Sequence, residues 1–154
     1  MIQYITGDIL SAAEQAIVNP VNCEGVAGAG LAKDFKISYP DNFSKYKLDC
    51  SSKYLRPGKL SIFEYADWLN DTRYIINFPT KDKWKDPSKL SYISNGLEEL
   101  ISVVMNKQIR SIGIPKLGCG LGGLHWNDVR VLLDDFNDQL ELLSKCDIMV
   151  YEFN

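Results

Sequence analysis

The sequence predicts an α/β domain with three α/β/α layers, in which helices cover both faces of a central mixed sheet. Short apolar segments of strand length alternate with longer segments of helical periodicity along the chain. Residues 59–65 and 73–78 predict a hairpin across a polar stretch, which adds an antiparallel pair. Two glycine-rich loops each join a strand to a helix. At 154 residues, one domain over 1–154 is expected.

The first half of the chain begins with two short apolar strands, at residues 3–5 and 16–19. Pro20 is expected to stop the second strand, because proline cannot donate a ladder hydrogen bond. The glycine-dense loop at residues 25–30 follows, and a helix is expected to begin at Leu31. This order predicts a strand, a glycine loop and a helix in direct succession.

Two further helices have recognisable starts. Pro40 is expected to end the preceding helix, and Asp41 is a suitable N-cap for the next one. Asp86 is expected to cap the clearest helix, with Pro87 at its first position, where a missing N–H costs nothing. Its apolar residues fall on one stripe: Leu90, Ile93, Leu97, Leu100, Ile101 and Val104.

The last part of the chain repeats the strand–glycine–helix order. Residues 110–114 predict a strand, and the second glycine loop occupies residues 118–123. A helix follows, with an apolar face formed by Val129, Leu132, Leu133, Phe136, Leu140 and Leu143. Residues 147–152 predict the final strand.

Composition excludes several classes of protein. The net charge of −3 argues against a general nucleic-acid coat protein, although local basic patches remain compatible with it. A single histidine and four cysteines without a C-x-x-C pair predict no metal site and no disulfide framework. Neither a signal peptide nor a membrane span is expected, so the predicted location is the cytoplasm.

The two glycine loops could bind an anion. A strand–glycine–helix unit offers backbone N–H groups at a helix N-terminus, and ligands of open α/β sheets bind outside the carboxyl ends of the strands. Two such loops could hold the two halves of a diphosphate. Glycines also make tight turns without any ligand, and spacing alone leaves the two interpretations equally open.

Particular motifs add a family resemblance. Residues 7–9 (GDI), 16–22 (AIVNPVN), 28–32 (GAGLA) and 114–123 (IPKLGCGLGG) occur in the order typical of a macrodomain, and the match covers essentially the whole chain. With residues 74–81 (YIINFPTK), the sequence resembles the branch that contains the DarG antitoxin macrodomains and the terminal ADP-ribose protein glycohydrolase.

The resemblance implies an ADP-ribose site. Asp8, otherwise a turn or cap residue, would accept from the adenine amine, with the Ile9 backbone beside it. Asn22, otherwise an Asx-turn residue, would hold the distal ribose. Phe153 would pack against adenine. The remaining binding residues would come from the two loops: Gly28, Ala29, Gly30, Leu31, Gly118, Cys119, Gly120, Leu121, Gly122 and Gly123.

By the same resemblance, Lys81 would be the nucleophile, although among neighbouring charges it resembles a solvated lysine. Its neutral amine would attack C1″ of the distal ribose. The acid/base partner stays open. The terminal ADP-ribose protein glycohydrolase carries an acidic residue where this chain, like the DarG pattern, has Gly122. His125, more simply an exposed residue at a helix start, and Glu24 are the candidates.

The implied function is hydrolysis of ADP-ribose from a DNA base or an acidic protein side chain, with no cofactor. A reader that binds ADP-ribose without turnover, and an ADP-ribose 1″-phosphate phosphatase, are the alternatives. ADP-ribosylated macromolecules and a cognate ADP-ribosyltransferase would be partners; a membrane would not. Residues 81–85 (KDKWK) could contact DNA, or form an exposed loop in which Trp84 covers the next helix.

Overall fold

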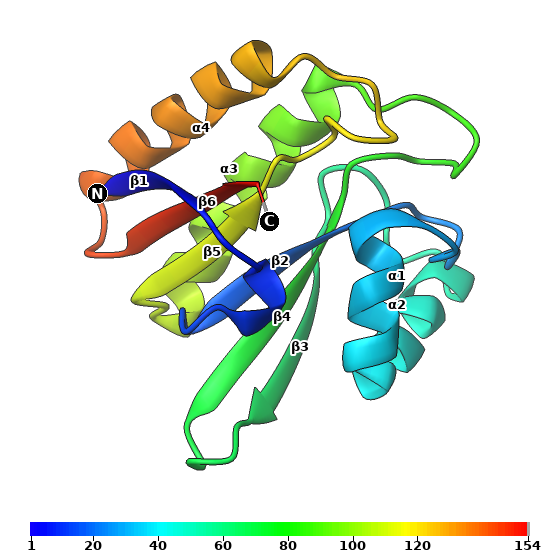
Figure 1. Ribbon diagram of the computed structural model, residues 1–154, viewed down its shortest axis with the longest axis horizontal. Helices are drawn as coiled ribbons and strands as arrows, with labels where there is room; N and C mark the ends of the chain where they lie inside the picture. The colour runs from blue at the N-terminus through cyan, green and yellow to red at the C-terminus, as the bar shows by residue number, and fades with distance from the viewer. Residues whose placement is uncertain (154) are drawn as a thin grey trace.

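The computed structural model describes residues 1–153, and the side chains of residues 1–152 (Figure 1). Its strands are β1 (Ile2–Thr6), β2 (Ala16–Val21), β3 (Ser61–Ala66), β4 (Thr72–Pro79), β5 (Ser111–Pro115) and β6 (Asp147–Phe153). Its helices are α1 (Gly30–Ser38), α2 (Pro40–Ser51), α3 (Leu90–Lys107) and α4 (Trp126–Glu141), with a short 3₁₀ turn, η1 (Ile9–Ser11). The expected alternation of strands and helices is present.

The strands form one mixed sheet in the order β1-β6-β5-β2-β4-β3. Every neighbouring pair is parallel except β3 and β4, which form the expected antiparallel hairpin. The carboxyl ends of β2, β4, β5 and β6 therefore point to the same edge of the sheet. Figure 1 shows the long connections after β2, β4 and β5 gathered at this edge, with the β3–β4 hairpin extending away from it.

Successive residues of β2 supply the two faces of the sheet. Ala16 and Val18 belong to the large core that α3 and α4 cover, whereas Ile17 packs with Phe35 of α1 on the opposite face. This alternation follows from the two-residue period of a strand. Helices cover both faces, as the sequence predicts, with α1 and α2 on one side and α3 and α4 on the other (Figure 1).

A glycine inside α3 sets the distance between this helix and the sheet. Gly96 lies against the ring of Phe78 on β4, where even a Cβ atom would overlap the ring. A helical glycine costs about 1 kcal/mol relative to alanine. Here that cost is offset because the large, fully buried Phe78 side chain can pack directly under the helix axis.

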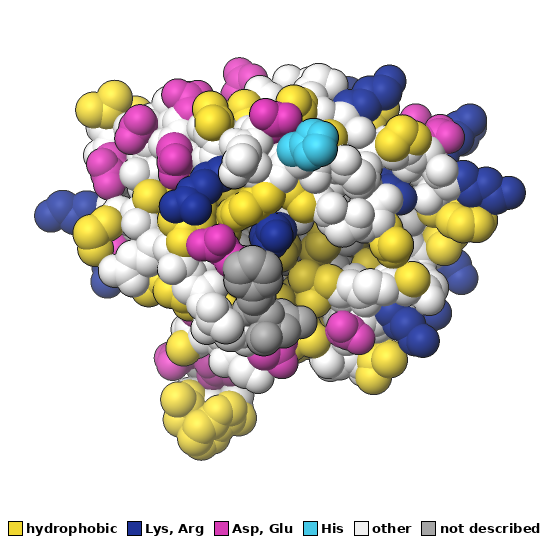
Figure 2. Space-filling model, turned by 45° about the horizontal axis from the view of Figure 1, so that its top comes forward, with side chains coloured by type: hydrophobic (Ala, Val, Ile, Leu, Met, Phe, Trp, Pro, Cys, Tyr) yellow, Lys and Arg dark blue, Asp and Glu magenta, His cyan; other side chains and the backbone are white. Residues whose placement is uncertain are grey.

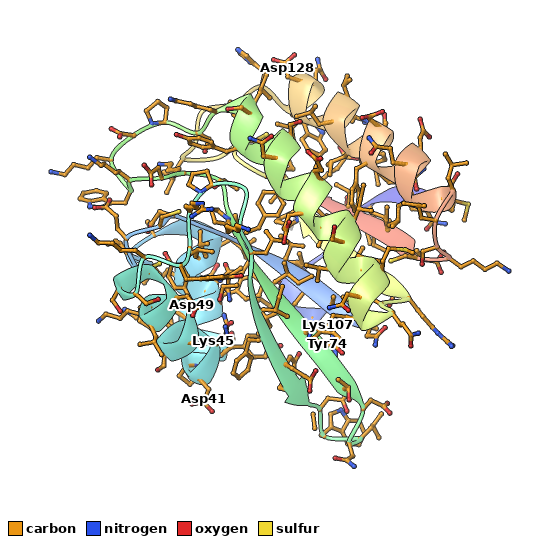
Figure 3. All side chains as sticks on the ribbon, turned by 180° about the vertical axis from the view of Figure 1, so that it is seen from behind. Asp41, Lys45, Asp49, Tyr74, Lys107 and Asp128 are labelled. Carbon is orange, nitrogen blue, oxygen red and sulfur yellow. The ribbon has the colours of Figure 1, made fainter. Side chains whose placement is uncertain are left out.

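On the other face, a buried cluster of three asparagines joins α2 to the sheet. The Asn77 side chain exchanges hydrogen bonds with Asn42 at 2.8 and 3.1 Å, and Asn19 donates to it at 3.0 Å. Farther along α2, Asp49 accepts from Ser61 of β3 at 2.6 Å and from Lys45 at 2.7 Å (Figure 3). These bonds hold α2 in place beside the edge where the strands end.

Several expected element boundaries are wrong; the first helix, for example, begins at Gly30 and not at Leu31. The clearest helix begins at Leu90 and not at Asp86, because Ser88 pairs its backbone N–H with the Gly122 carbonyl at 3.0 Å. The second helix begins at Pro40, before Asp41. β2 continues through Pro20 to Val21; β2 pairs with β5 only at Ala16 and Ile17, so Pro20 has one partner strand.

Within the part of the chain that the structure describes, no helix is long and apolar enough to span a membrane.

Candidate functional site

A cleft of about 740 Å³ lies at the carboxyl ends of the central strands. Figure 2 shows it as a hollow with hydrophobic side chains at its base. Strand ends supply part of the wall, through Pro20, Val21, Pro115, Tyr151 and Glu152. The loops after β2, β4 and β5 and the first turn of α1 supply the rest: Asn22, Val26, Ala27, Gly28, Ala29, Gly30, Leu31, Ala32, Thr80, Lys81, Trp84, Lys116, Gly118, Cys119, Gly120, Leu121 and Gly122.

The first glycine loop brings the N-terminus of α1 to the cleft. Ala29 is the N-cap and provides no side-chain hydrogen bond, so the first-turn N–H groups have no side-chain acceptor. Gly30 adopts a φ of 61°, and the space above the Cα of Gly28 is open. Bare N–H groups, a helix dipole and an absence of side chains together suit a phosphate group.

The second glycine loop forms the opposite wall, and its glycines have different reasons to be there. Gly118 and Gly123 have φ values of 73° and 81°, which favour glycine. Gly120 faces open space. Any Cβ at Gly122 would overlap the Ser88 hydroxyl and the Gly118 carbonyl. The acidic residue that the terminal ADP-ribose protein glycohydrolase carries at this position therefore has no room here.

Asn22 lines the cleft and also shapes the first loop. Its side-chain oxygen accepts from the Glu24 N–H at 2.9 Å and from the Tyr46 hydroxyl at 2.9 Å, and its amide nitrogen donates to the Val26 carbonyl at 2.7 Å. Tyr46 is buried in α2, so the loop is tied to that helix. The Asx-type turn that the sequence allows is present. A ribose contact stays a prediction.

Lys81 also lines the cleft. It follows Thr80, the first residue after β4. Its ammonium group donates to the Trp84 carbonyl at 3.2 Å. The segment containing Lys81 is bound to the segment after β2: Cys23 donates its backbone N–H to the Asp82 carbonyl at 2.9 Å and its thiol to the Lys81 carbonyl at 3.6 Å. The backbone that carries Lys81 is therefore held in place by hydrogen bonds to the segment after β2.

The two acid/base candidates lie outside the residues that line the cleft. Glu24 is exposed, and its carboxylate accepts from the Trp84 N–H at 2.8 Å. His125 is an exposed N-cap residue of α4, which agrees with the simpler interpretation of the sequence; Figure 2 shows the histidine on the surface (cyan). Glu24 and Lys81 thus bind the N–H and the carbonyl of the same residue, Trp84, whereas His125 takes no part in this arrangement.

Asp8 caps η1 by accepting from the Leu10 N–H at 3.0 Å. Asp8 is exposed and Ile9 is buried, so only the backbone of Ile9 could meet a ligand. Neither is among the cleft-lining residues. The ring of Tyr151 connects them to the cleft, because it lines the cleft and packs against the cluster that contains Ile9.

The aromatic residue of β6 that the structure places at the cleft is Tyr151, which the sequence did not single out; the Phe153 side chain lies outside the described residues. The Tyr151 hydroxyl donates to Glu14 at 2.7 Å. Burial is the larger cause that raises the pKa of Tyr151, and this hydrogen bond adds to it. Thr80, Lys116 and Glu152 were also missed. The alternation of faces along β6 could have distinguished Tyr151 from its sequence neighbours. Tyr151 pairs with Pro115, the last residue of β5, and therefore lies at the edge where the strands end.

Cys119 lies in the second loop, and its thiol donates to the Leu117 carbonyl at 3.4 Å. Burial raises the pKa of this thiol, an effect that Lys116 partly opposes. A protonated thiol is a poor nucleophile, so Cys119 acts as a small wall residue.

Comparisons with known proteins agree on one family. The Macro domain family model matches residues 18–133. A Mycobacterium bovis protein named "DNA ADP-ribosyl glycohydrolase" is 44% identical over 91% of this chain and 40% of its own length. The solved structure "Macrodomain of Mycobacterium tuberculosis DarG" has a TM-score of 0.91 and 42% identity, covering 98% of this chain and 97% of that one.

Thermosipho africanus supplies a third relative. A protein named as a fusion of a DNA ADP-ribosyl transferase with a DNA ADP-ribosyl glycohydrolase is 31% identical over 92% of this chain and 40% of its own length. The structure "Thermosipho africanus DarTG in complex with ADP-ribose" has a TM-score of 0.90 and 30% identity, covering 99% of this chain and 41% of that one. The present chain spans about 40% of the length of these two curated relatives.

Proposed function

The chain belongs to the Macro domain family, and on that premise we propose that its cleft binds ADP-ribose and hydrolyses the bond between ADP-ribose and a modified DNA base. The names of the relatives favour DNA over an acidic protein side chain. The two glycine loops would hold the diphosphate, because both offer backbone without side chains to the same space. A cognate ADP-ribosyltransferase would supply the substrate.

The observation that carries catalysis is the place of Lys81. It is held on the wall of the same cleft, by a backbone braced to the segment after β2. In the proposed reaction, the neutral amine attacks C1″ of the distal ribose, and the bond from C1″ to the base breaks. The leaving base takes up a proton. Water then hydrolyses the lysine adduct, which releases ADP-ribose and returns the free amine.

The experiment compares the native protein with two variants on three substrates: an ADP-ribosylated oligonucleotide, a Glu-linked ADP-ribosylated protein and ADP-ribose 1″-phosphate. Lys81→Ala should abolish ADP-ribose release while leaving ADP-ribose binding nearly intact, since the amine acts on C1″ and not on adenine or phosphate. Lys81→Arg should also be inactive, because guanidinium keeps its proton. Borohydride added during turnover should trap an adduct on the native protein only.

The outcomes separate the competing functions. Full activity in Lys81→Ala would contradict the lysine mechanism and favour attack by water. A native protein that binds ADP-ribose but turns over none of the substrates would be a reader. Release of phosphate alone, from ADP-ribose 1″-phosphate, would favour the phosphatase.

A further inference from the structure

Trp84 has an unusual place for a large apolar side chain. It lines the cleft beside Lys81, yet 48% of its surface is exposed. It belongs to none of the three hydrophobic clusters among the described residues. A half-exposed tryptophan at a binding cleft offers a broad flat surface to a ligand.

The other two tryptophans show the contrast. Trp126 packs against the large core and donates its indole N–H to Glu152 at 3.3 Å. Trp68 is 90% exposed in the turn between β3 and β4, at the end of the hairpin that points away from the gathered loops (Figure 1). Packing accounts for Trp126, and Trp68 lies away from the cleft. Only Trp84 combines exposure with a position at the cleft.

The backbone of Trp84 is fixed on both sides. Its N–H donates to the Glu24 carboxylate at 2.8 Å, and its carbonyl accepts from the Lys81 ammonium at 3.2 Å. The neighbouring Asp82 carbonyl accepts from the Cys23 N–H. The backbone that carries the indole is therefore held at a defined place next to the lysine, which reduces the entropy lost when a ligand stacks on the indole.

Two lysines flank this tryptophan in the sequence, although the chain as a whole has a net charge of −3. Lys83 and Lys85 are exposed on either side of it in the sequence, and the Lys85 ammonium lies 5.2 Å from the ring centroid. A flat aromatic ring flanked by cations is the arrangement that binds single-stranded nucleic acid, in which bases stack and phosphates need positive charge.

We infer that Trp84 is a stacking platform for the DNA base that carries ADP-ribose, and that Lys83 and Lys85 contact the phosphates that flank this base. This inference rests on the proposed function and names the subsite for the rest of the substrate. The bond to be cut joins C1″ to the base, so a base leaving the Lys81 end of the cleft meets the indole first. A base can reach this ring only when it is out of the duplex stack.

The test measures binding, so it does not depend on turnover. In a Lys81→Ala background, Trp84→Ala should weaken binding of a single-stranded oligonucleotide with one ADP-ribosylated base by about 5- to 150-fold. Affinity for free ADP-ribose should change less than about twofold, because the stacked base is absent from it. Trp84→Phe should keep most of the affinity, and Trp68→Ala, the matched control, should keep all of it.

A second measurement examines the lysines. Removing both Lys83 and Lys85 should reduce the slope of log affinity against log salt by about 0.7 for each lysine that contacts a phosphate. Unchanged oligonucleotide binding in Trp84→Ala, or equal losses for free ADP-ribose and the oligonucleotide, would overturn the inference. A native protein that releases no ADP-ribose would contradict the proposed function alone, since the binding comparison still decides the role of Trp84.

Discussion

The Glu24 carboxylate accepts a hydrogen bond from the Trp84 N–H at 2.8 Å, although the two residues are 60 positions apart in the sequence. The carbonyl of the same Trp84 accepts a hydrogen bond from the Lys81 ammonium group. One residue therefore connects a candidate base and the candidate nucleophile. This geometry favours Glu24 as a positioning residue, because its carboxylate is already engaged with the backbone.

Glu24 variants separate positioning from proton transfer. Glu24→Gln keeps an oxygen that accepts from the Trp84 N–H but cannot act as a base, so it should retain ADP-ribose release within about threefold. Glu24→Ala removes the acceptor and should lower kcat by about tenfold or more, since a hydrogen bond to a charged group contributes about 1.5–3 kcal/mol. Steady-state kinetics on ADP-ribosylated oligonucleotide measure both. Equal, severe losses in the two variants would instead identify a general base.

Gly120 and Gly122 are two residues apart but face different surroundings. Gly120→Val adds a side chain to open cleft space at an ordinary φ, so it should weaken ADP-ribose binding with little change in Tm. Gly122→Ala would collide with Ser88 and should lower Tm first. Calorimetry and thermal unfolding of the pair check this. If Gly120→Val lost stability before affinity, the glycine would serve the turn and not the ligand.

Asp8 is tested with two ligands. If its carboxylate accepts from the adenine amine, Asp8→Ala should raise the Kd for ADP-ribose about tenfold or more. Inosine diphosphate ribose lacks that amine, so its affinity should be nearly the same for the native protein and the variant. Circular dichroism checks that the variant stays folded after it loses the hydrogen bond from the Leu10 N–H. Equal losses for both ligands would point to a folding effect of the cap.

Buried thiols and phenols predict loss of stability at high pH. Burial, with a smaller effect of Asp82, raises the pKa of Cys23 from 9.0 to about 12. Above pH 9.0 the unfolded thiol ionises while the folded thiol keeps its proton, so stability must fall as pH rises towards 12. The urea midpoint should drop as the pH rises from 9.0 towards about 12, and Cys23→Ala should reduce that drop. An identical drop in the variant would assign the effect to the other thiols, such as Cys146, and to the tyrosines.

Local pattern determined the strands, helices and glycine loops of this chain, because the alternation of apolar residues reflects which face of an element is buried. The apolar stripe of α3 and the hairpin of β3 and β4 were predictable for that reason. The family motifs also directed attention to Lys81, which the structure places on the cleft wall. Periodicity alone would have left Lys81 among ordinary surface charges.

Long-range contacts decided the rest. The start of α3 at Leu90 depends on Ser88 pairing with Gly122, and the exclusion of a side chain at Gly122 depends on the same Ser88. The engagement of Glu24 with Trp84, and the exposure of that indole at the cleft, arise where loops from two neighbouring strands meet. The sequence by itself determined which segments would be buried. Which loop groups satisfy one another depends on which strands are neighbours, and only the tertiary structure decided that.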